Sequence, residues 1–227
     1  MSFTPGDIET ITVDSYGTLV DPSAAVGALD DHVEETESIS QQWRNESITY
    51  TMVGNFTDEY RPFYDLNRSA LRYALSAHGV ELPEETVEEI LSVYHELEVF
   101  DDVRSGIERL IDGGYPVYVV SNGNPEMLES MVDHAEIDEL IEDTISAHEI
   151  RTFKPDVEIY RHAAARTGTP IGSIAHVAGP RFDIQGAMHA GIQGVWLDRA
   201  GDPWGAFGSE PDLRVEGFEE LADALSV

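Results

Sequence analysis

The order of apolar and polar residues along the chain predicts alternating strands and helices. A β-branched run at 11–13 predicts a short buried strand near the start. Later apolar runs bounded by glycine, asparagine or proline predict further strands at 115–120, 143–146, 173–178 and 194–197. Apolar residues at helical spacing predict helices at 24–40, 41–53, 62–78, 83–100, 104–112, 125–134, 155–167 and 183–190. The sequence therefore predicts an α/β protein.

The predicted strands are unevenly distributed, which indicates two parts. Residues 21–100 contain helical patterns and no convincing strand, whereas strand and helix alternate from about residue 101 onward. Repeated strand–helix units are typical of a parallel sheet that is covered on both faces. We therefore expect a Rossmann-like parallel-sheet core formed by residues 1–20 and 101–227, with an all-helical cap subdomain inserted at 21–100.

The charge of the chain is its most unusual compositional feature. Its 227 residues include 44 Asp and Glu but 13 Lys and Arg, which gives a formal net charge of −31. Such a surface repels nucleic acid. The acidic residues are scattered through amphipathic segments, so they predict a solvated coat on a folded protein. Because concentrated salt screens this self-repulsion, we hypothesise that the protein comes from a salt-accumulating halophile.

Other compositional features narrow the class of protein. The chain has no cysteine, so it has neither disulfides nor thiolate metal ligands. It has no basic and apolar leader and no apolar run long enough to span a membrane. These features predict a cytoplasmic protein without a membrane partner.

Polar residues with complementary chemistry follow several predicted strands. Asp14 follows the first strand, and Ser121 with Asn122 follows the second, while Lys154 and Asp183 lie in later loops or helix starts. In open α/β sheets ligands bind at the carboxyl ends of strands. An Asp held there can act as a nucleophile and form a covalent ester. The alternative is that Asp14 only begins a turn, a common role for Asp after a strand.

Four sequence segments carry a resemblance to a known family. These are D-S-Y-G-T-L-V-D from Asp14, V-V-S-N-G up to Gly123, F-K-P around Lys154 with Tyr160 six residues later, and F-D-I-Q-G-A-M-H-A-G-I from Phe182. Together they resemble the four motifs of the haloacid dehalogenase (HAD) superfamily of hydrolases. Within it the chain is most similar to the L-2-haloacid dehalogenases (type II), whose cap carries a tryptophan–arginine pair like Trp43-Arg44.

The resemblance implies a HAD-like fold, a reaction and a set of site residues. The implied enzyme is a hydrolase that cleaves the carbon–halogen bond of short 2-haloalkanoic acids through an aspartyl ester, without metal or other cofactor. Asp14, Lys154, Asp183 and Arg44 would be catalytic. A small carboxylate substrate would be contacted by Tyr16, Thr18, Asn45, Ile48, Phe63, Ser121, Asn122, Tyr160 and Phe182. Because the resembling dehalogenases commonly form dimers, a homodimer is also expected.

Two other classes of function stay open at this point. Most members of the superfamily that this chain resembles are magnesium-dependent phosphatases, which carry a second aspartate two residues after the nucleophile to protonate the leaving alcohol. This chain has Tyr16 there, and its 179–183 segment has one carboxylate where phosphatases tend to carry a pair for magnesium. The third class is an interaction protein that kept the fold without turnover.

Some residues depart from the dehalogenase pattern or have ordinary structural interpretations. The family places a serine and an asparagine where this chain has Ala178 and Pro180, which points to slower ester hydrolysis or another substrate. Trp43 and Phe63 have the spacing of packing residues in the insertion. His176 is interpreted as an ordinary strand residue, and none of the eight histidines is assigned a function.

Overall fold

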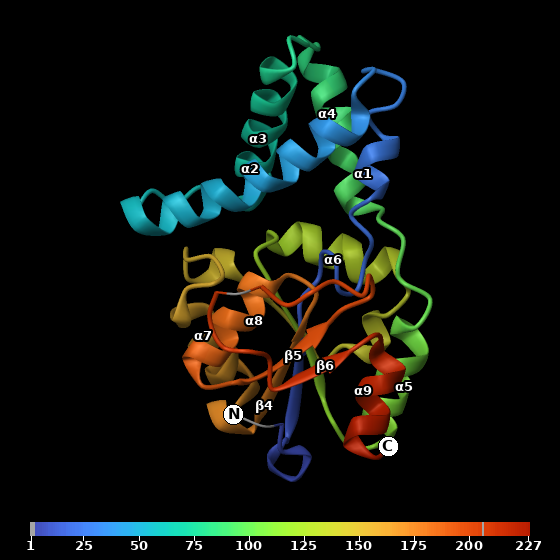
Figure 1. Cartoon of the computed structure of the whole chain (residues 1–227), viewed down its shortest axis with the longest axis vertical. Coiled ribbons are helices and arrows are strands. Elements are labelled where there is room, and N and C mark those ends of the chain that lie inside the picture. The colour runs from blue at the N-terminus through green and yellow to red at the C-terminus, as the bar shows by residue number, and fades with distance from the viewer. Residues whose placement is uncertain (1–2, 206) are drawn as a thin grey trace.

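The computed structural model describes residues 3–205 and 207–227, and a parallel sheet lies at the centre of these residues (Figure 1). Within them the sheet has six strands in the order β3-β2-β1-β4-β5-β6, and neighbouring strands pair in parallel. The strands are β1 (Thr10–Val13), β2 (Val117–Ser121), β3 (Asp143–Ser146), β4 (Ile174–Ala178), β5 (Gln193–Leu197) and β6 (Leu213–Val215).

Helices cover both faces of this sheet. On one side α5 (Val103–Asp112) packs against α9 (Phe218–Leu225), and on the other α7 (Val157–Thr167) packs against α8 (Arg181–Ala190) (Figure 1). The α6 helix (Pro125–His134) packs against β3. Because both faces are covered, β1, β4 and most of β2 are buried, which explains their nearly continuous apolar runs. Short 3-10 turns occur at Pro5–Asp7, Val93–His95, Asp138–Leu140, Ala147–Glu149 and Ile171–Ser173.

A group of helices lies between β1 and β2 in the chain and above the sheet in Figure 1. The helices are α1 (Ala24–Gly27), α2 (Thr36–Thr57), α3 (Phe63–Ala77) and α4 (Glu84–Ser92). The segment that leaves the sheet and the segment that returns to it are hydrogen-bonded to each other. The Asp21 amide donates to the Glu98 carbonyl at 2.9 Å, and the Phe100 amide donates to the Leu19 carbonyl at 3.0 Å. We call these four helices the helical insertion.

The structure corrects two predicted helices of the insertion. The helix predicted at 24–40 was wrong, since α1 ends at Gly27 and α2 begins only at Thr36. The intervening residues place like charges four positions apart, Asp30 with Glu34 and Asp31 with Glu35, and such pairs destabilise a helix. The helix predicted at 83–100 ends at Ser92, because the chain must turn back to the core, where Val99 bridges to Val20.

Two elements near the carboxyl end were absent from the sequence prediction. The β6 strand is only three residues long, and α9 follows it after a short turn. No helix among the described residues has the length and apolar character needed to cross a membrane.

The strand order creates a crevice at one point of the sheet. From β1 the chain first adds β2 and β3 on one side and then β4, β5 and β6 on the other. The connections therefore diverge between β1 and β4, and ligands of open α/β sheets bind at such a switch point, beyond the carboxyl ends of the strands. The residues that follow β1 and β4 are thus placed next to this crevice.

Candidate active site

Asp14 directly follows β1 and is held at the crevice by two side chains. The Lys154 ammonium lies 2.9 Å from its Oδ1, and the Thr18 hydroxyl donates to its Oδ2 at 3.1 Å. Gly17 has a φ of 81°, which allows the turn that brings Thr18 back to the carboxylate. The Asp14 side chain is only 9% exposed, so it is largely shielded from bulk water.

Lys154 is the only lysine of the sequence, and it lies at the centre of this site. Its side chain is 1% exposed, and its ammonium bridges Asp14 and the Asp183 Oδ2, the latter at 2.6 Å. The backbone amide of Lys154 donates to the Asn122 side-chain oxygen at 2.8 Å, which fixes the loop to the end of β2. The buried ammonium needs its two carboxylate partners, because burying an unpaired charge is costly.

Asp183 lies in the first turn of α8 and is fully buried. Its Oδ2 accepts from Lys154, while its Oδ1 lies 2.6 Å from the Tyr160 hydroxyl and 3.0 Å from the His176 Nε2. Residues from β1, the 153–155 loop, α7, β4 and α8 thus meet in one buried polar network.

The charges in this network shift each other's pKa. Burial alone would lower the pKa of Lys154, but Asp14 and Asp183 raise it above its ordinary value of 10.5. Burial would raise the pKa of Asp183, but His176 and Lys154 hold it below its ordinary value of 3.8. For Asp14, burial raises the pKa above 3.8, and the Lys154 ammonium opposes that rise. The lysine is therefore charged at neutral pH.

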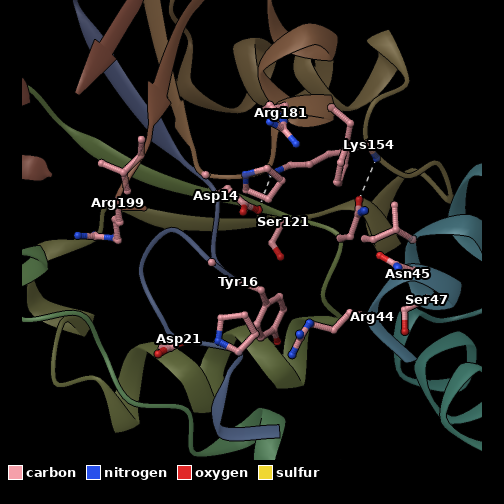
Figure 2. Close-up of a pocket in the computed structure, with 18 of the residues that line it drawn as sticks. Asp14, Tyr16, Asp21, Arg44, Asn45, Ser47, Ser121, Lys154, Arg181 and Arg199 are labelled. Atoms are coloured by element: carbon pink, nitrogen blue, oxygen red, sulfur yellow. Dashed lines mark hydrogen bonds and ion pairs between the residues drawn. The ribbon is translucent and has the colours of Figure 1, made fainter. Parts of the chain in front are cut away.

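A cavity of about 540 Å³ opens between this network and the helical insertion. Figure 2 shows Asp14, Ser121 and Lys154 on the core side, with Arg44 and Asn45 extending from the insertion. The sequence-predicted site residues that line the cavity are Asp14, Tyr16, Arg44, Asn45, Ile48, Phe63, Ser121, Asn122, Lys154 and Phe182. Most of the residues selected from the sequence are therefore brought together.

Three of the selected residues do not line the cavity. Thr18, Tyr160 and Asp183 are buried behind it. Tyr160 was expected to contact substrate, but its hydroxyl is bonded to Asp183 instead. Asp183 contacts Lys154 and does not line the cavity, so the geometry favours a role in orienting the lysine over direct activation of water.

The insertion is joined to the core beside Lys154. The Asn55 side chain near the end of α2 accepts from the Phe153 amide at 3.0 Å and donates to the Phe153 carbonyl at 2.7 Å. The Tyr60 ring stacks on Phe153 at 5.3 Å. These contacts fix α2, which carries Arg44, relative to the loop that carries Lys154. The Arg44 guanidinium is oriented in turn by a 2.8 Å hydrogen bond to Ser40.

Several features of the site were not found from the sequence. Arg181 and Arg199 line the outer part of the cavity, and the Tyr16 hydroxyl is buried without a hydrogen-bond partner among the described residues. Trp43, by contrast, has the packing role that its spacing predicts, since it is fully buried and its indole N–H donates to the Asn67 carbonyl within the insertion. The contact of His176 with Asp183 was also missed. A lone polar residue in an otherwise apolar buried strand was the available signal, because buried polar groups are nearly always hydrogen-bonded.

The carboxylates of this site do not fit a divalent metal ion. Asp14 Oδ1 and Asp183 Oδ2, which would have to face a shared cation, are both bonded to the Lys154 ammonium. The other oxygen of Asp183 is occupied by Tyr160 and His176. Among the described residues, no group of three His, Cys, Asp or Glu side chains is arranged to hold a metal.

A parallel sheet with a helical insertion after β1 and a buried Asp–Lys–Asp site beside a cavity is the arrangement of an α/β enzyme, and sequence comparison identifies its family. Residues 8–191 match the model of the haloacid dehalogenase-like hydrolases. The chain belongs to this family.

Individual relatives resemble the chain over nearly its whole length. It is 31% identical over 214 residues to (S)-2-haloacid dehalogenase 4A of Burkholderia cepacia, covering 94% of this chain and 90% of the relative. It is 29% identical to (S)-2-haloacid dehalogenase H-109 of Pseudomonas putida, covering 96% of this chain and 98% of the relative. A crystal structure of an L-2-haloacid dehalogenase superposes with a TM-score of 0.93 at 27% identity, covering 97% and 99% of the two chains.

The single lysine makes its charge state directly measurable. In protein labelled with ¹³C-lysine, we expect the Lys154 side-chain NMR signal to titrate only above pH 10.5, because two carboxylates stabilise the ammonium. Since the folded pKa exceeds the unfolded value, this ammonium stabilises the fold at lower pH, and the contribution is lost as the pH rises through the folded pKa. In Asp183→Asn the pKa of Lys154 should fall, because only the Asp14 carboxylate then opposes the lowering of this pKa by burial. An unchanged titration in Asp183→Asn would contradict this electrostatic account.

Proposed function

We propose that the protein is a metal-independent hydrolase that cleaves the carbon–halogen bond of short (S)-2-haloalkanoic acids. The observation that carries the proposal is the buried Lys154 ammonium, which holds Asp14 beside the cavity and occupies the place that a metal would need. The relatives named (S)-2-haloacid dehalogenases support the choice of substrate class.

In the first step Asp14 acts as the nucleophile. One of its oxygens attacks carbon 2 of the substrate from the side opposite the halogen, a carbon–oxygen bond forms, and the halide leaves with the bonding electron pair. Lys154 and Thr18 hold the carboxylate in place for this attack. Holding the nucleophile in a water-poor site also limits the hydration that would weaken it.

In the second step water hydrolyses the ester. The water oxygen adds to the Asp14 side-chain carbon and the ester bond to the substrate breaks, which releases a 2-hydroxy acid and restores the carboxylate. The released proton goes to solvent. Asp183 supports both steps through Lys154, since its own oxygens are bonded to Lys154, Tyr160 and His176.

The two ends of the substrate require different surroundings. Ser121 and Asn122 would hold its carboxylate, and the apolar lining of Ile48, Phe63 and Phe182 would accommodate its short carbon chain. Arg44 would face the departing halide, because a weakly hydrated guanidinium suits a large soft anion. The Tyr16 hydroxyl, which has no hydrogen-bond partner within residues 3–205 and 207–227, is available as a further donor in this cavity, whereas a phosphatase would need an acid at that position.

The organisation of the molecule supports further proposals. We assign residues 1–20 and 101–227 to the core and 21–100 to a cap that contributes Arg44 and encloses the substrate, with the paired connections at Leu19–Asp21 and Glu98–Phe100 as their boundary.

Exposed apolar side chains on α2 and α3, namely Val53, Phe56 and Tyr73, support a homodimer. The acidic surface supports a cytoplasmic protein of a halophile that does not bind nucleic acid.

Replacing the nucleophile tests the proposed reaction. Wild-type protein in concentrated sodium sulfate with EDTA should release halide from L-2-chloropropionate and not from the D form. Asp14→Asn should reduce this release by about 10⁴-fold or more, because no ester can form efficiently without the carboxylate. Halide release is measured by ion chromatography.

The matched control is Asp112→Asn, which makes the same chemical change at an exposed position at the end of α5. It should release halide at the wild-type rate. Halide release by folded Asp14→Asn at the wild-type rate would refute the nucleophile. Magnesium-dependent phosphate release from phosphate esters, without halide release, would support the phosphatase instead.

Salt dependence tests the halophile proposal. At a net charge of −31, the midpoint of thermal unfolding should rise as KCl is increased from low concentration to about 1 M, where the screening length falls to about 3 Å. Circular dichroism is the measurement, with a sucrose series as a control for general stabilisation. A protein that is equally stable in dilute buffer and in molar KCl would contradict the proposal.

A further inference from the structure

His176 lies in the middle of β4 and is fully buried, although the proposed reaction assigns it no step. Its Nε2 lies 3.0 Å from Asp183 Oδ1, and its Nδ1 lies 2.9 Å from the Thr12 hydroxyl. A carboxylate can only accept a hydrogen bond, so Nε2 is the nitrogen that carries a proton toward Asp183. Both ring nitrogens are therefore engaged, which fixes the ring orientation.

The contacts of His176 belong to a path that begins at Thr12 in β1 and ends at Asp14, which directly follows β1. Thr12 pairs with His176 across the β1–β4 ladder, His176 contacts Asp183, Asp183 contacts Lys154, and Lys154 contacts Asp14, two residues after Thr12. Side chains two residues apart along a strand share a face. Thr12, His176, Asp183 and Lys154 are each at most 1% exposed, so water does not compete effectively for the hydrogen bonds among them.

The two donors on Asp183 Oδ1 have a geometric consequence. Tyr160 approaches this oxygen from α7 and His176 approaches it from β4. Two donors from separate elements restrict rotation of the carboxylate, so its other oxygen stays directed at the Lys154 ammonium. Ala178 and Pro180, at the end of β4 and the start of α8, have no side-chain hydrogen-bonding group that could replace His176.

We propose that His176 is a positioning residue that fixes the rotation of the Asp183 carboxylate and, through it, the place of the Lys154 ammonium beside Asp14. This inference deepens the proposed dehalogenase function and rests on it for its kinetic part. It assigns His176 no contact with substrate, because the cavity is lined by Lys154 and Asp14 and not by His176 or Asp183.

The test compares two substitutions at this position. His176→Phe keeps a planar ring and removes both nitrogens, whereas His176→Gln places an amide NH₂ near the position of Nε2. His189→Gln, at an exposed position in the last turn of α8, is the control for loss of a histidine. Thermal unfolding identifies the variants that fold. Thr12→Val, which removes the hydroxyl facing Nδ1, is a second probe if His176→Phe does not fold.

Two readouts are taken for each folded variant. The first is the NMR signal of the single lysine, which should shift in His176→Phe and return toward the wild-type position in His176→Gln. The second is halide release from L-2-chloropropionate, where His176→Phe should lower kcat by about 10- to 100-fold, as expected for a lost hydrogen bond to a buried charge. KM should stay within about twofold, because the lost interaction does not touch bound substrate. His176→Gln should recover part of the lost kcat, and Thr12→Val should change both readouts in the direction of His176→Phe.

The outcomes separate this inference from the proposed function. A folded His176→Phe or Thr12→Val variant with an unchanged lysine signal and wild-type kcat overturns the inference while dehalogenation stands. A fall in kcat without a shift of the lysine signal also overturns it, because the effect would not act through Lys154. A shifted lysine signal in a protein whose wild type releases no halide supports the positioning of Lys154 and refutes the dehalogenase.

Discussion

The structure of the site depends on one buried ammonium held between two carboxylates. Lys154 bonds Asp14 at 2.9 Å and Asp183 at 2.6 Å, and its side chain is 1% exposed. Removing either carboxylate would leave the lysine short of a partner, and removing the lysine would leave two like charges buried together. This mutual requirement explains why residues distant in sequence share one fixed arrangement. It also leaves Asp14 as the carboxylate of the trio that faces the cavity.

The fold supplies this arrangement through its strand order. Because β1 lies between β2 and β4, the loops that follow these three strands meet at one edge of the sheet. The core contributes the charged network, and the insertion contributes the opposite wall of the cavity with Arg44. The hydrogen bonds between Asn55 and Phe153 join these two contributions next to Lys154.

Much of this site was predictable because strand ends are visible in the sequence. Apolar runs followed by polar residues located Asp14, Lys154 and Asp183, and the parallel sheet required them to converge. The network behind the cavity was less accessible, because periodicity does not reveal which way a buried polar side chain turns. Tyr160 was therefore expected at the substrate, although it contacts Asp183. His176 was interpreted as a strand residue, which is correct for its backbone but omits its hydrogen bonds. The helix predicted across 24–40 was wrong because apolar periodicity takes no account of the like charges that oppose a helix between Gly27 and Thr36.

The most direct test of the account is a single turnover in ¹⁸O-labelled water with enzyme in excess over L-2-chloropropionate. Mass spectrometry would then measure the label in the peptide that contains Asp14 and in the 2-hydroxy acid product. If Asp14 forms the ester, water attacks its side-chain carbon, so the label should appear in the Asp14 peptide and not in the product. Label in the product hydroxyl with an unlabelled Asp14 peptide would show direct attack by water and contradict the account.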